Sequence, residues 1–338
     1  MVAAHALRAE ALGFDGLNIP EAVHDGFVGA TLALAATTRI RVATSVAVAF
    51  PRSPMAVAIA AWDLAALSGS RFELGLGSQV RGNIEGRYAT AWTSPVPRMR
   101  EYVLALRQIF SAFQTGSDLS FSGESYRFDR LQPFFRPDPL DEFSLPIHLG
   151  GVGPKMTALA AEVADGLITH PTNTAPRYLR EILLPRLAEV AGIESKGPYA
   201  EVLRQTGFRL IVGCRVATGR NAMAVNRDRE KARKTLAFLY STPAYWPSLE
   251  IFGWQNRGEQ LLEMSRMGRW QDMADVVSDE MLDAFVPSAP YEGIADLLRT
   301  RYEGLTDTLT LPMPENPEDD ALMGQVIANL QGKNPSSI

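Results

Sequence analysis

The stretch RIRVATSVAVAFPRSPMAVAIAAWDLAALSGSRFELGLGSQ, residues 39–79, decides the fold. It contains two apolar runs, Arg41 to Ala49 and Phe72 to Leu76, on either side of a helix-length segment that starts after Pro51 and Pro54. Neither run alternates apolar with polar residues, as a half-exposed strand would. The pattern therefore predicts two parallel strands that are buried on both faces and joined by a crossover helix.

The rest of the chain repeats this alternation. Strand-like runs are predicted at about 17–19, 41–49, 72–76, 146–149, 166–169, 208–216 and 308–312. Helix-length intervals separate them at 27–37, 54–67, 97–115, 154–164, 176–190 and 290–302. Alternation of this kind favours parallel βα units. The chain begins inside a helix rather than a strand, so a first strand is expected to be missing, through a late start site or through loss from the fold.

Three segments depart from the alternation. Residues 121–135 place aromatic residues around a glycine and predict a hairpin-like excursion. Residues 221–285 predict a helical insertion, whose aromatic residues could form a lid over a pocket or ordinary core. Residues 1–313 are expected to form a single domain, followed by an acidic, weakly helical tail at 314–338.

Composition excludes several classes of protein. The 338 residues carry a formal charge of −5, and the basic residues are scattered, which argues against a nucleic-acid surface. No apolar run reaches the roughly 18 residues of a membrane span. Cys214 is the single cysteine, reads as a buried strand residue, and fits a reducing compartment such as the cytoplasm. The four histidines lack the spacing of a metal site, so no metal is expected.

A longer motif resembles the luciferase-like monooxygenase superfamily, which contains flavin enzymes and deazaflavin enzymes that use coenzyme F420. The motif consists of Thr38, Arg39, Ile40, Thr44, Arg52, Pro54, Asp63, Leu67, Ser68, Arg71, Leu74, Gly75, Leu76 and Gly77. The segments TSPVPRMREY and PIHLGGVGPKM extend the resemblance. It implies a (β/α)8 TIM barrel with the helical insertion late in the chain, and an enzyme that is usually a homodimer.

The resemblance also implies contacts for a flavin-like ring. A non-prolyl cis peptide between Ser45 and Val46 would form a bulge behind the ring. Polar contacts to the ring or its side chain would come from the stretch LGLGSQVRGN, through Ser78, Gln79, Val80 and Asn83. Deazaflavin sugar-phosphate dehydrogenases have a glutamate acid where this chain has Val80, which puts that activity in doubt.

Two histidines follow predicted strands, where parallel barrels place their chemistry. His24 could hydrogen-bond the reacting end of the ring or pass a proton to substrate, with Asp25 or Glu21 setting its tautomer. The alternative is an ordinary surface histidine. His170, at the end of the run LITH, is a weaker candidate on the substrate side.

Anions have two predicted partners. The loop Gly150, Gly151, Val152 and Gly153 precedes a helix that begins with Pro154, so its amides could hold a cofactor phosphate. Arg52, Arg81 and Lys155 could bind substrate or the cofactor's phosphate and polyglutamate tail, or could be solvated loop charges. Arg98 and Glu101 are expected to pair along their own helix.

Taken together, the sequence predicts an oxidoreductase that moves a hydride between coenzyme F420 and a small organic substrate. One alternative is an FMN-dependent monooxygenase that acts with O2 on the same fold. A second, of another class, is a barrel that binds a ligand without catalysis. Neither nucleic acid nor a membrane is an expected partner.

Overall fold

Residues 39–79 fold as predicted in the computed structural model, which describes residues 1–192, 205–306 and 308–332. The first apolar run forms β2 (Arg41–Thr44) and β3 (Ala47–Val48), and the second forms β4 (Phe72–Gly77). Helix α3 (Pro54–Ser68) joins them, and both β2 and β3 pair with β4 in parallel. All six residues of β4 are buried, which confirms a strand covered on both faces.

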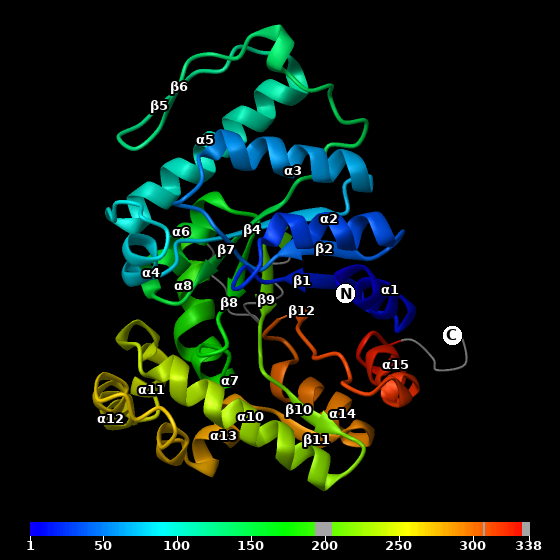
Figure 1. Ribbon diagram of the computed structural model, residues 1–338, viewed down its shortest axis with the longest axis vertical. Coiled ribbons are helices and arrows are strands. Elements are labelled where there is room, and N and C mark those ends of the chain that lie inside the picture. Colours follow the sequence, from blue (N-terminus) through cyan, green and yellow to red (C-terminus); the bar gives the residue numbers. More distant parts are fainter. Residues whose placement is uncertain (193–204, 307, 333–338) are drawn as a thin grey trace. The chain divides into compact units, whose positions relative to one another are not determined.

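The chain divides into two compact units, and the first comprises residues 1–150 and 159–166. Its parallel strands lie side by side in the order β1, β2, β4 and β7, with α1, α2, α3 and α5 following one another outside them (Figure 1). Besides the elements already given, it contains α1 (Val2–Ala11), β1 (Gly16–Ile19), α2 (Gly26–Ala36), α4 (Arg81–Gly86), α5 (Pro95–Thr115), β5 (Phe121–Ser122), β6 (Arg127–Phe128), η1 (Pro133–Phe135) and most of β7 (Ile147–Gly151).

Local sequence signals set the limits of α3. The Ser53 hydroxyl accepts a hydrogen bond from the Ala56 amide at 3.1 Å, and Pro54 occupies the first turn, where its missing N–H is not needed. Gly69 ends the helix in the left-handed conformation, at φ 60°. The crossover helix is therefore encoded by residues within the motif itself.

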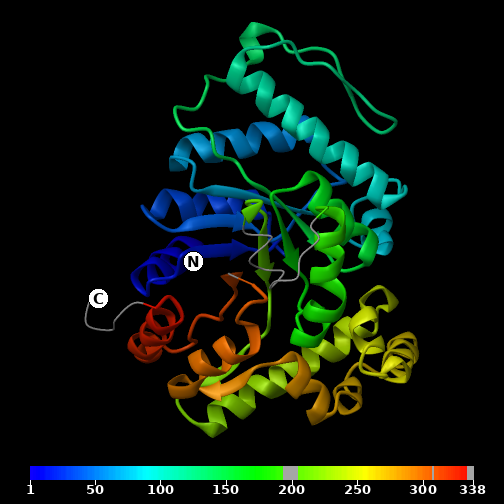
Figure 2. The same cartoon turned by 180° about the vertical axis from the view of Figure 1, so that it is seen from behind.

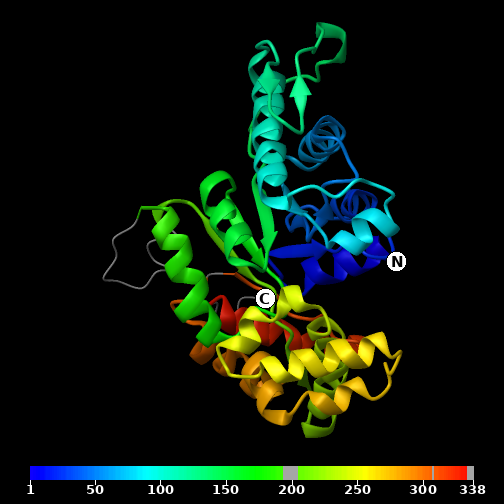
Figure 3. The same ribbon diagram turned by 90° about the vertical axis from the view of Figure 1, so that its left-hand side faces the viewer.

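The excursion at 121–135 is a hairpin, as predicted, and β5 pairs antiparallel with β6 beside the long helix α5 (Figure 3). Glu101 of α5 accepts hydrogen bonds from the amides of Glu124 and Ser125 at 3.0 and 2.7 Å. Arg98 donates to the Tyr126 hydroxyl at 2.9 Å. The predicted pairing of Arg98 with Glu101 is therefore wrong, because the hairpin supplies both side chains with partners.

The second unit comprises residues 151–158 and 167–338. Its strands follow the order β8, β9, β12, and a separate parallel pair, β10 with β11, lies against α10 and α14 (Figures 1 and 2). Its elements are α6 (Pro154–Val163, shared with the first unit), β8 (Gly166–Thr169, Gly166 lying in the first unit), α7 (Pro176–Tyr178), η2 (Leu179–Leu183), α8 (Leu184–Val190), β9 (Arg209–Val212), β10 (Ala217–Gly219), α10 (Ala222–Tyr240), η3 (Pro243–Tyr245), α11 (Pro247–Glu250), α12 (Gln255–Arg266), η4 (Met273–Val276), α13 (Asp279–Phe285), β11 (Ser288–Pro290), α14 (Tyr291–Tyr302), β12 (Thr308–Leu309), η5 (Pro317–Asp319) and α15 (Asp320–Leu330).

The predicted insertion is helical, since α10 to α13 occupy residues 222–285. Among its aromatic residues, Tyr240 and Phe285 are buried core. Phe252 and Trp254 are half-buried, stack on each other at 4.6 Å between ring centres, and both contact Phe285. Cys214 is buried, as predicted, and burial raises the pKa of its thiol to about 12. Among the described residues, no helix combines the length and apolar character that crossing a membrane requires.

Candidate functional site

In the first unit, the loop after β1 is fixed by an arginine between two carboxylates. Arg52 binds Glu21 through both guanidinium nitrogens, at 3.0 and 2.9 Å, and binds Asp25 at 2.6 Å. Glu21 also accepts the Val48 amide at 2.9 Å, and its side chain is only 6% exposed. The guanidinium therefore holds the loop in place, and the contact of Arg52 with substrate or with a cofactor tail stays a prediction.

Asp25 has a second role as the N-cap of α2. Its carboxylate accepts the amides of Phe27 and Val28 at 2.8 and 3.1 Å. Burial by itself would raise the pKa of Asp25, but the Val28 and Phe27 amides and Arg52 together lower it. The carboxylate is therefore stabilised in its charged form at the start of a helix.

His24 lies between these two anchors and is exposed. Among the described residues, neither Glu21 nor Asp25 hydrogen-bonds its imidazole, because Arg52 and backbone amides occupy both carboxylates. The expectation that one of them sets the tautomer of His24 is therefore wrong. The side chains of Glu21 and Asp25 hold the loop on either side of His24, and within the described chain neither ring nitrogen of this exposed imidazole has a partner.

Val46 forms a small apolar ledge over two glycines of the same unit. The Ser45–Val46 peptide bond is cis, which confirms the expectation. A Cβ atom on Gly77 would lie 2.5 Å from Val46 Cγ2, and one on Gly150 would lie 3.2 Å from Val46 Cγ1. Glycine at both positions is what lets the isopropyl group lie against the ends of β4 and β7.

The residues after β4 turn sharply into α4, a helix that the sequence did not predict. Gln79 has a positive φ of 58°, and its side-chain oxygen accepts the Val80 amide at 2.9 Å. Ser78, Gln79, Val80 and Asn83 are all partly exposed, so their polar groups can reach a ligand. Arg81 is 70% exposed and pairs with Glu85 at 3.0 Å, on the surface of α4.

The glycine loop leads from β7 into α6, and Gly151, Val152 and Gly153 belong to the second unit. The Gly151 carbonyl accepts from Asn173 Nδ2, and the Val152 carbonyl accepts from the Tyr178 hydroxyl, each at 3.2 Å. Among the described residues, the Val152 and Gly153 amides donate to no carbonyl. A Cβ atom on Gly153 would meet no atom within 4 Å. The loop is thus fixed through its carbonyls, while its amides stay open to an anion. Lys155, in the first turn of α6, is exposed.

His170 follows β8 and stacks on Tyr245 from the insertion, with 4.4 Å between ring centres and 12° between planes. Its Nδ1 atom lies 2.9 Å from the Thr172 hydroxyl and 3.4 Å from the Thr172 amide nitrogen. Because an amide can only donate, Nδ1 is the acceptor and the neutral ring carries its proton on Nε2. The sequence missed Tyr245, although it lies in the aromatic segment 241–254 that suggested a lid.

Burial, assisted by the charge of Arg215, lowers the pKa of His170 to about 4. The unfolded chain, with an ordinary pKa of about 6.5, binds this proton first as the pH falls. Stability from the neutral ring is therefore complete above pH ~6.5 and is lost as the pH falls toward 4.

We expect the free energy of unfolding to fall by about 2 kcal/mol more in the wild-type protein than in His170→Gln between pH 7 and pH 5. Urea unfolding of both proteins at the two pH values measures the difference. An equal fall in both proteins would contradict a buried neutral imidazole.

Known proteins resemble this chain along most of its length. The profile of the luciferase-like monooxygenase family matches residues 1–308. A Mycobacterium tuberculosis protein without an assigned function is 40% identical over 89% of this chain and 86% of its own length. The F420-dependent glucose-6-phosphate dehydrogenase of Nakamurella multipartita is 30% identical over 78% of this chain and 73% of its own.

Solved structures share the fold. The F420-dependent tetrahydromethanopterin reductase of Methanopyrus kandleri superposes with a TM-score of 0.75 at 16% identity, over 98% of this chain and 94% of its own. The FMN-bound oxygenating component of 3,6-diketocamphane monooxygenase from Pseudomonas putida gives a TM-score of 0.63 at 14% identity, over 100% and 92%. The fold is thus the luciferase-like TIM barrel, as predicted. With its matching profile over most of the chain, this protein belongs to the luciferase-like monooxygenase family, whose members are enzymes.

Proposed function

We propose that this protein is an F420-dependent oxidoreductase acting on a small organic substrate. When bound, the deazaflavin supplies the hydride chemistry at its ring. Its family includes enzymes of this kind, among them the F420-dependent relative that is 30% identical. Family membership alone is also consistent with FMN as the cofactor, so the choice between F420 and FMN depends on the residues of the site.

The Val46 ledge is the observation that supports ring binding most directly. Gly77 and Gly150 leave room for the Val46 side chain, and the neighbouring Ser45, Ser78, Gln79, Val80 and Asn83 are partly exposed. An apolar support bordered by polar groups suits a flat heteroaromatic ring. We assign ring contacts to these residues, and contacts to the cofactor phosphate to the open amides of Val152 and Gly153.

His24 is the proposed proton donor or acceptor at the reacting substrate atom. Its loop is anchored on both sides, by Glu21 and by Asp25, so the backbone position of His24 is defined while its ring nitrogens remain accessible. Surface charges supply weaker contacts: we assign Arg81 and Lys155 to anionic groups at the edge of the site, because both are exposed.

Reconstitution separates the two cofactors. The purified protein is titrated with F420 and, separately, with FMN, and bound cofactor is followed by fluorescence. Reconstituted protein is then mixed with a panel of alcohols, aldehydes and sugar phosphates while the visible absorbance of F420 and oxygen uptake are recorded. We expect F420 binding and substrate-dependent bleaching without oxygen uptake. Tight FMN binding with substrate-dependent oxygen uptake would replace this proposal with the monooxygenase alternative, which the likeness to an FMN-bound structure keeps open.

Replacing Gly77 with alanine is expected to weaken F420 binding about tenfold or more. The new methyl would lie 2.5 Å from Val46 Cγ2 and would displace the ledge, and overpacking of this size costs roughly 1–3 kcal/mol. Fluorescence titration gives the dissociation constant. The double variant Gly77→Ala/Val46→Ala should recover most of the affinity, because it removes the clashing group. Gly82→Ala, where a Cβ meets nothing within 4 Å, is the matched control.

We also propose a homodimer formed through α2 and α3. These adjacent helices are almost entirely apolar, and Val28, Leu32, Ile59 and Leu67 on them are 47–61% exposed. Leu32→Glu should convert a dimer into a monomer in light scattering, because a charge would be buried without a partner. Met267→Glu, which changes an equally exposed side chain on another surface, should leave the mass unchanged. A wild-type monomer would contradict the proposal.

A further inference from the structure

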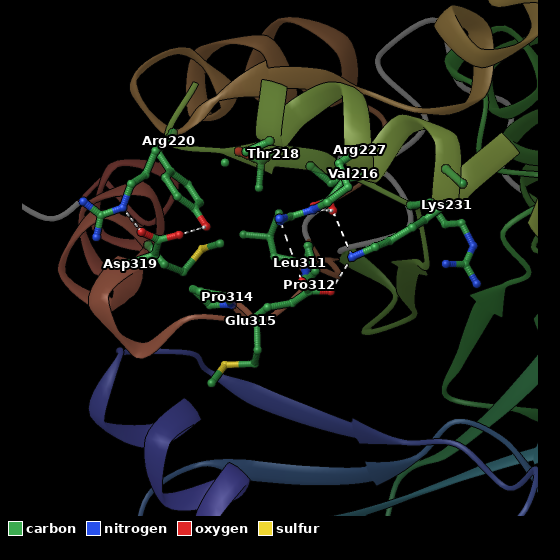
Figure 4. A pocket seen from close by; sticks show the side chains of 18 of the residues that line it. Val216, Thr218, Arg220, Arg227, Lys231, Leu311, Pro312, Pro314, Glu315 and Asp319 are labelled. Atoms are coloured by element: carbon green, nitrogen blue, oxygen red, sulfur yellow. Dashed lines mark hydrogen bonds and ion pairs between the residues drawn. The ribbon is translucent and has the colours of Figure 1, made fainter. Parts of the chain in front are cut away.

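A large cavity lies wholly within the second unit, beyond the ends of β9 and β12. Its volume is about 1050 Å³, at the upper end of the range for small-molecule sites. Residues after β9, the first turns of α10 and the segment after β12 form its walls (Figure 4). None of these side chains is among the residues assigned to cofactor binding or proton transfer above. The sequence motif did not include them either.

The charged side chains that line this cavity carry one more positive than negative charge. Its lining includes four cations, Arg215, Arg220, Arg227 and Lys231, against three carboxylates, Asp228, Glu315 and Asp319. Lys231 bridges Asp228 at 3.4 Å and also binds Glu315, and Arg227 lies 3.7 Å from both carboxylates (Figure 4). Arg220 is paired with Asp319.

Arg215 differs from the other three basic residues of the cavity, which all pair with carboxylates. Within the described part of the chain, it has no hydrogen-bond or ion-pair partner, and its exposed side chain lines the cavity, so its guanidinium is accessible to a ligand. An unpaired guanidinium in a concave site offers parallel donors that fit the two oxygens of a carboxylate or phosphate. The Arg227 and Lys231 side chains, held by Glu315, can add further donors if that carboxylate moves aside.

The cavity also borders the His170 site. Pro171, next in the chain to His170, lines it, and the charge of Arg215 acts on the imidazole. A ligand with its anionic end at Arg215 and its other end on the Pro171 side of the cavity would lie beside the residue next in the chain to His170, whose Nε2–H group is a donor for a carbonyl or hydroxyl oxygen. The two features together describe a ligand with an oxyanion at one end and a polar carbon–oxygen group nearer the other.

We propose that this cavity binds the carboxylate or phosphate group of the substrate, and that Arg215 is the residue that selects it. Naming the ligand as substrate rests on the proposed function, but anion binding itself does not. The substrate class is thereby narrowed to small organic anions, such as hydroxy acids, oxo acids or phosphorylated alcohols.

The test begins with the full chain and no cofactor. Inorganic phosphate and succinate are titrated into the wild-type protein, Arg215→Gln and Lys234→Gln by calorimetry, with thermal melting as the check on folding. Lys234 lies on α10 one turn from Lys231 but outside the cavity lining, which makes it the charge-matched control. We expect Arg215→Gln to weaken the binding of at least one anion about tenfold or more, and Lys234→Gln to bind as the wild type does. No binding by the wild type, or equal binding by Arg215→Gln, would overturn the proposal.

A second arm identifies the source of the anion. Complete F420 and the deazaflavin alcohol that lacks the phosphate and glutamate tail are each tested for displacement of the bound anion. If complete F420 displaces the anion and the deazaflavin alcohol does not, the cavity binds the anionic tail of the cofactor, and the substrate assignment is overturned. Retention of the anion in the presence of F420 supports it. If neither F420 nor FMN binds, the proposed function fails while the Arg215-dependent anion site remains measurable.

Discussion

Replacing Arg52 with glutamine is expected to lower the free energy of unfolding by about 3 kcal/mol. The guanidinium makes the two bonds to Glu21 and the one to Asp25, and its side chain is 23% exposed. Removing it leaves the Glu21 carboxylate buried, and among the residues that the structure describes the Val48 amide is then its one remaining partner. Breaking a buried pair from one side costs roughly 3–5 kcal/mol, and the greater exposure of Asp25 places this case at the lower end.

Urea unfolding of the wild type, Arg52→Gln, Glu21→Gln and the double variant measures this effect. Because the cost comes from an unpaired charge, the double variant should be more stable than Arg52→Gln. Arg81→Gln is the matched control, since its pair with Glu85 is exposed and should contribute at most about 0.5 kcal/mol. A similar loss in both arginine variants would show that Arg52 does not anchor a buried carboxylate.

Replacing His24 with glutamine is expected to lower kcat about 100-fold while the dissociation constant of F420 changes less than about threefold. Positioned proton transfer contributes roughly 10²- to 10⁴-fold to enzymatic rates, and glutamine can hydrogen-bond but cannot exchange a proton. Because the side-chain carboxylates of Glu21 and Asp25 hold the loop on either side of His24, the substitution should not disturb its conformation.

The measurement uses the substrate that gives the fastest turnover in the reconstitution panel. His5→Gln, an exposed histidine on α1, is the control and should leave kcat unchanged. Full activity in His24→Gln would leave this histidine as a surface residue, the alternative that its sequence context allowed.

The fold was predictable where local rules and burial agree. The uninterrupted apolar runs on either side of α3 could only be satisfied by strands buried on both faces, and Ser53, Pro54 and Gly69 are the residues that start and stop a helix. The glycines at 77 and 150–153 were likewise visible in the sequence. Their spacing did not reveal why Gly77 and Gly150 lack a side chain. The structure shows that Val46 occupies the space that a Cβ atom would need at these two positions.

Partners of charged and aromatic side chains were less predictable, because tertiary contacts decide them. Arg98 and Glu101 have the spacing of a helical ion pair, yet a hairpin more than 20 residues away competes successfully for both. The Tyr245 contact joins segments about 75 residues apart and has no local signature. The excess of positive charge near Arg215 becomes visible only once three separate segments come together.

The stack of Tyr245 on His170 places a residue of the helical insertion beside the proposed substrate site. Tyr245 belongs to the insertion, whereas the ledge and the glycine loop belong to the strands and the turns that follow them. Substitutions in the insertion can therefore change which substrates bind next to His170 without altering the residues assigned to the cofactor. Homologues that diverge around residues 241–254 are expected to differ in the molecules they convert while keeping a common redox partner.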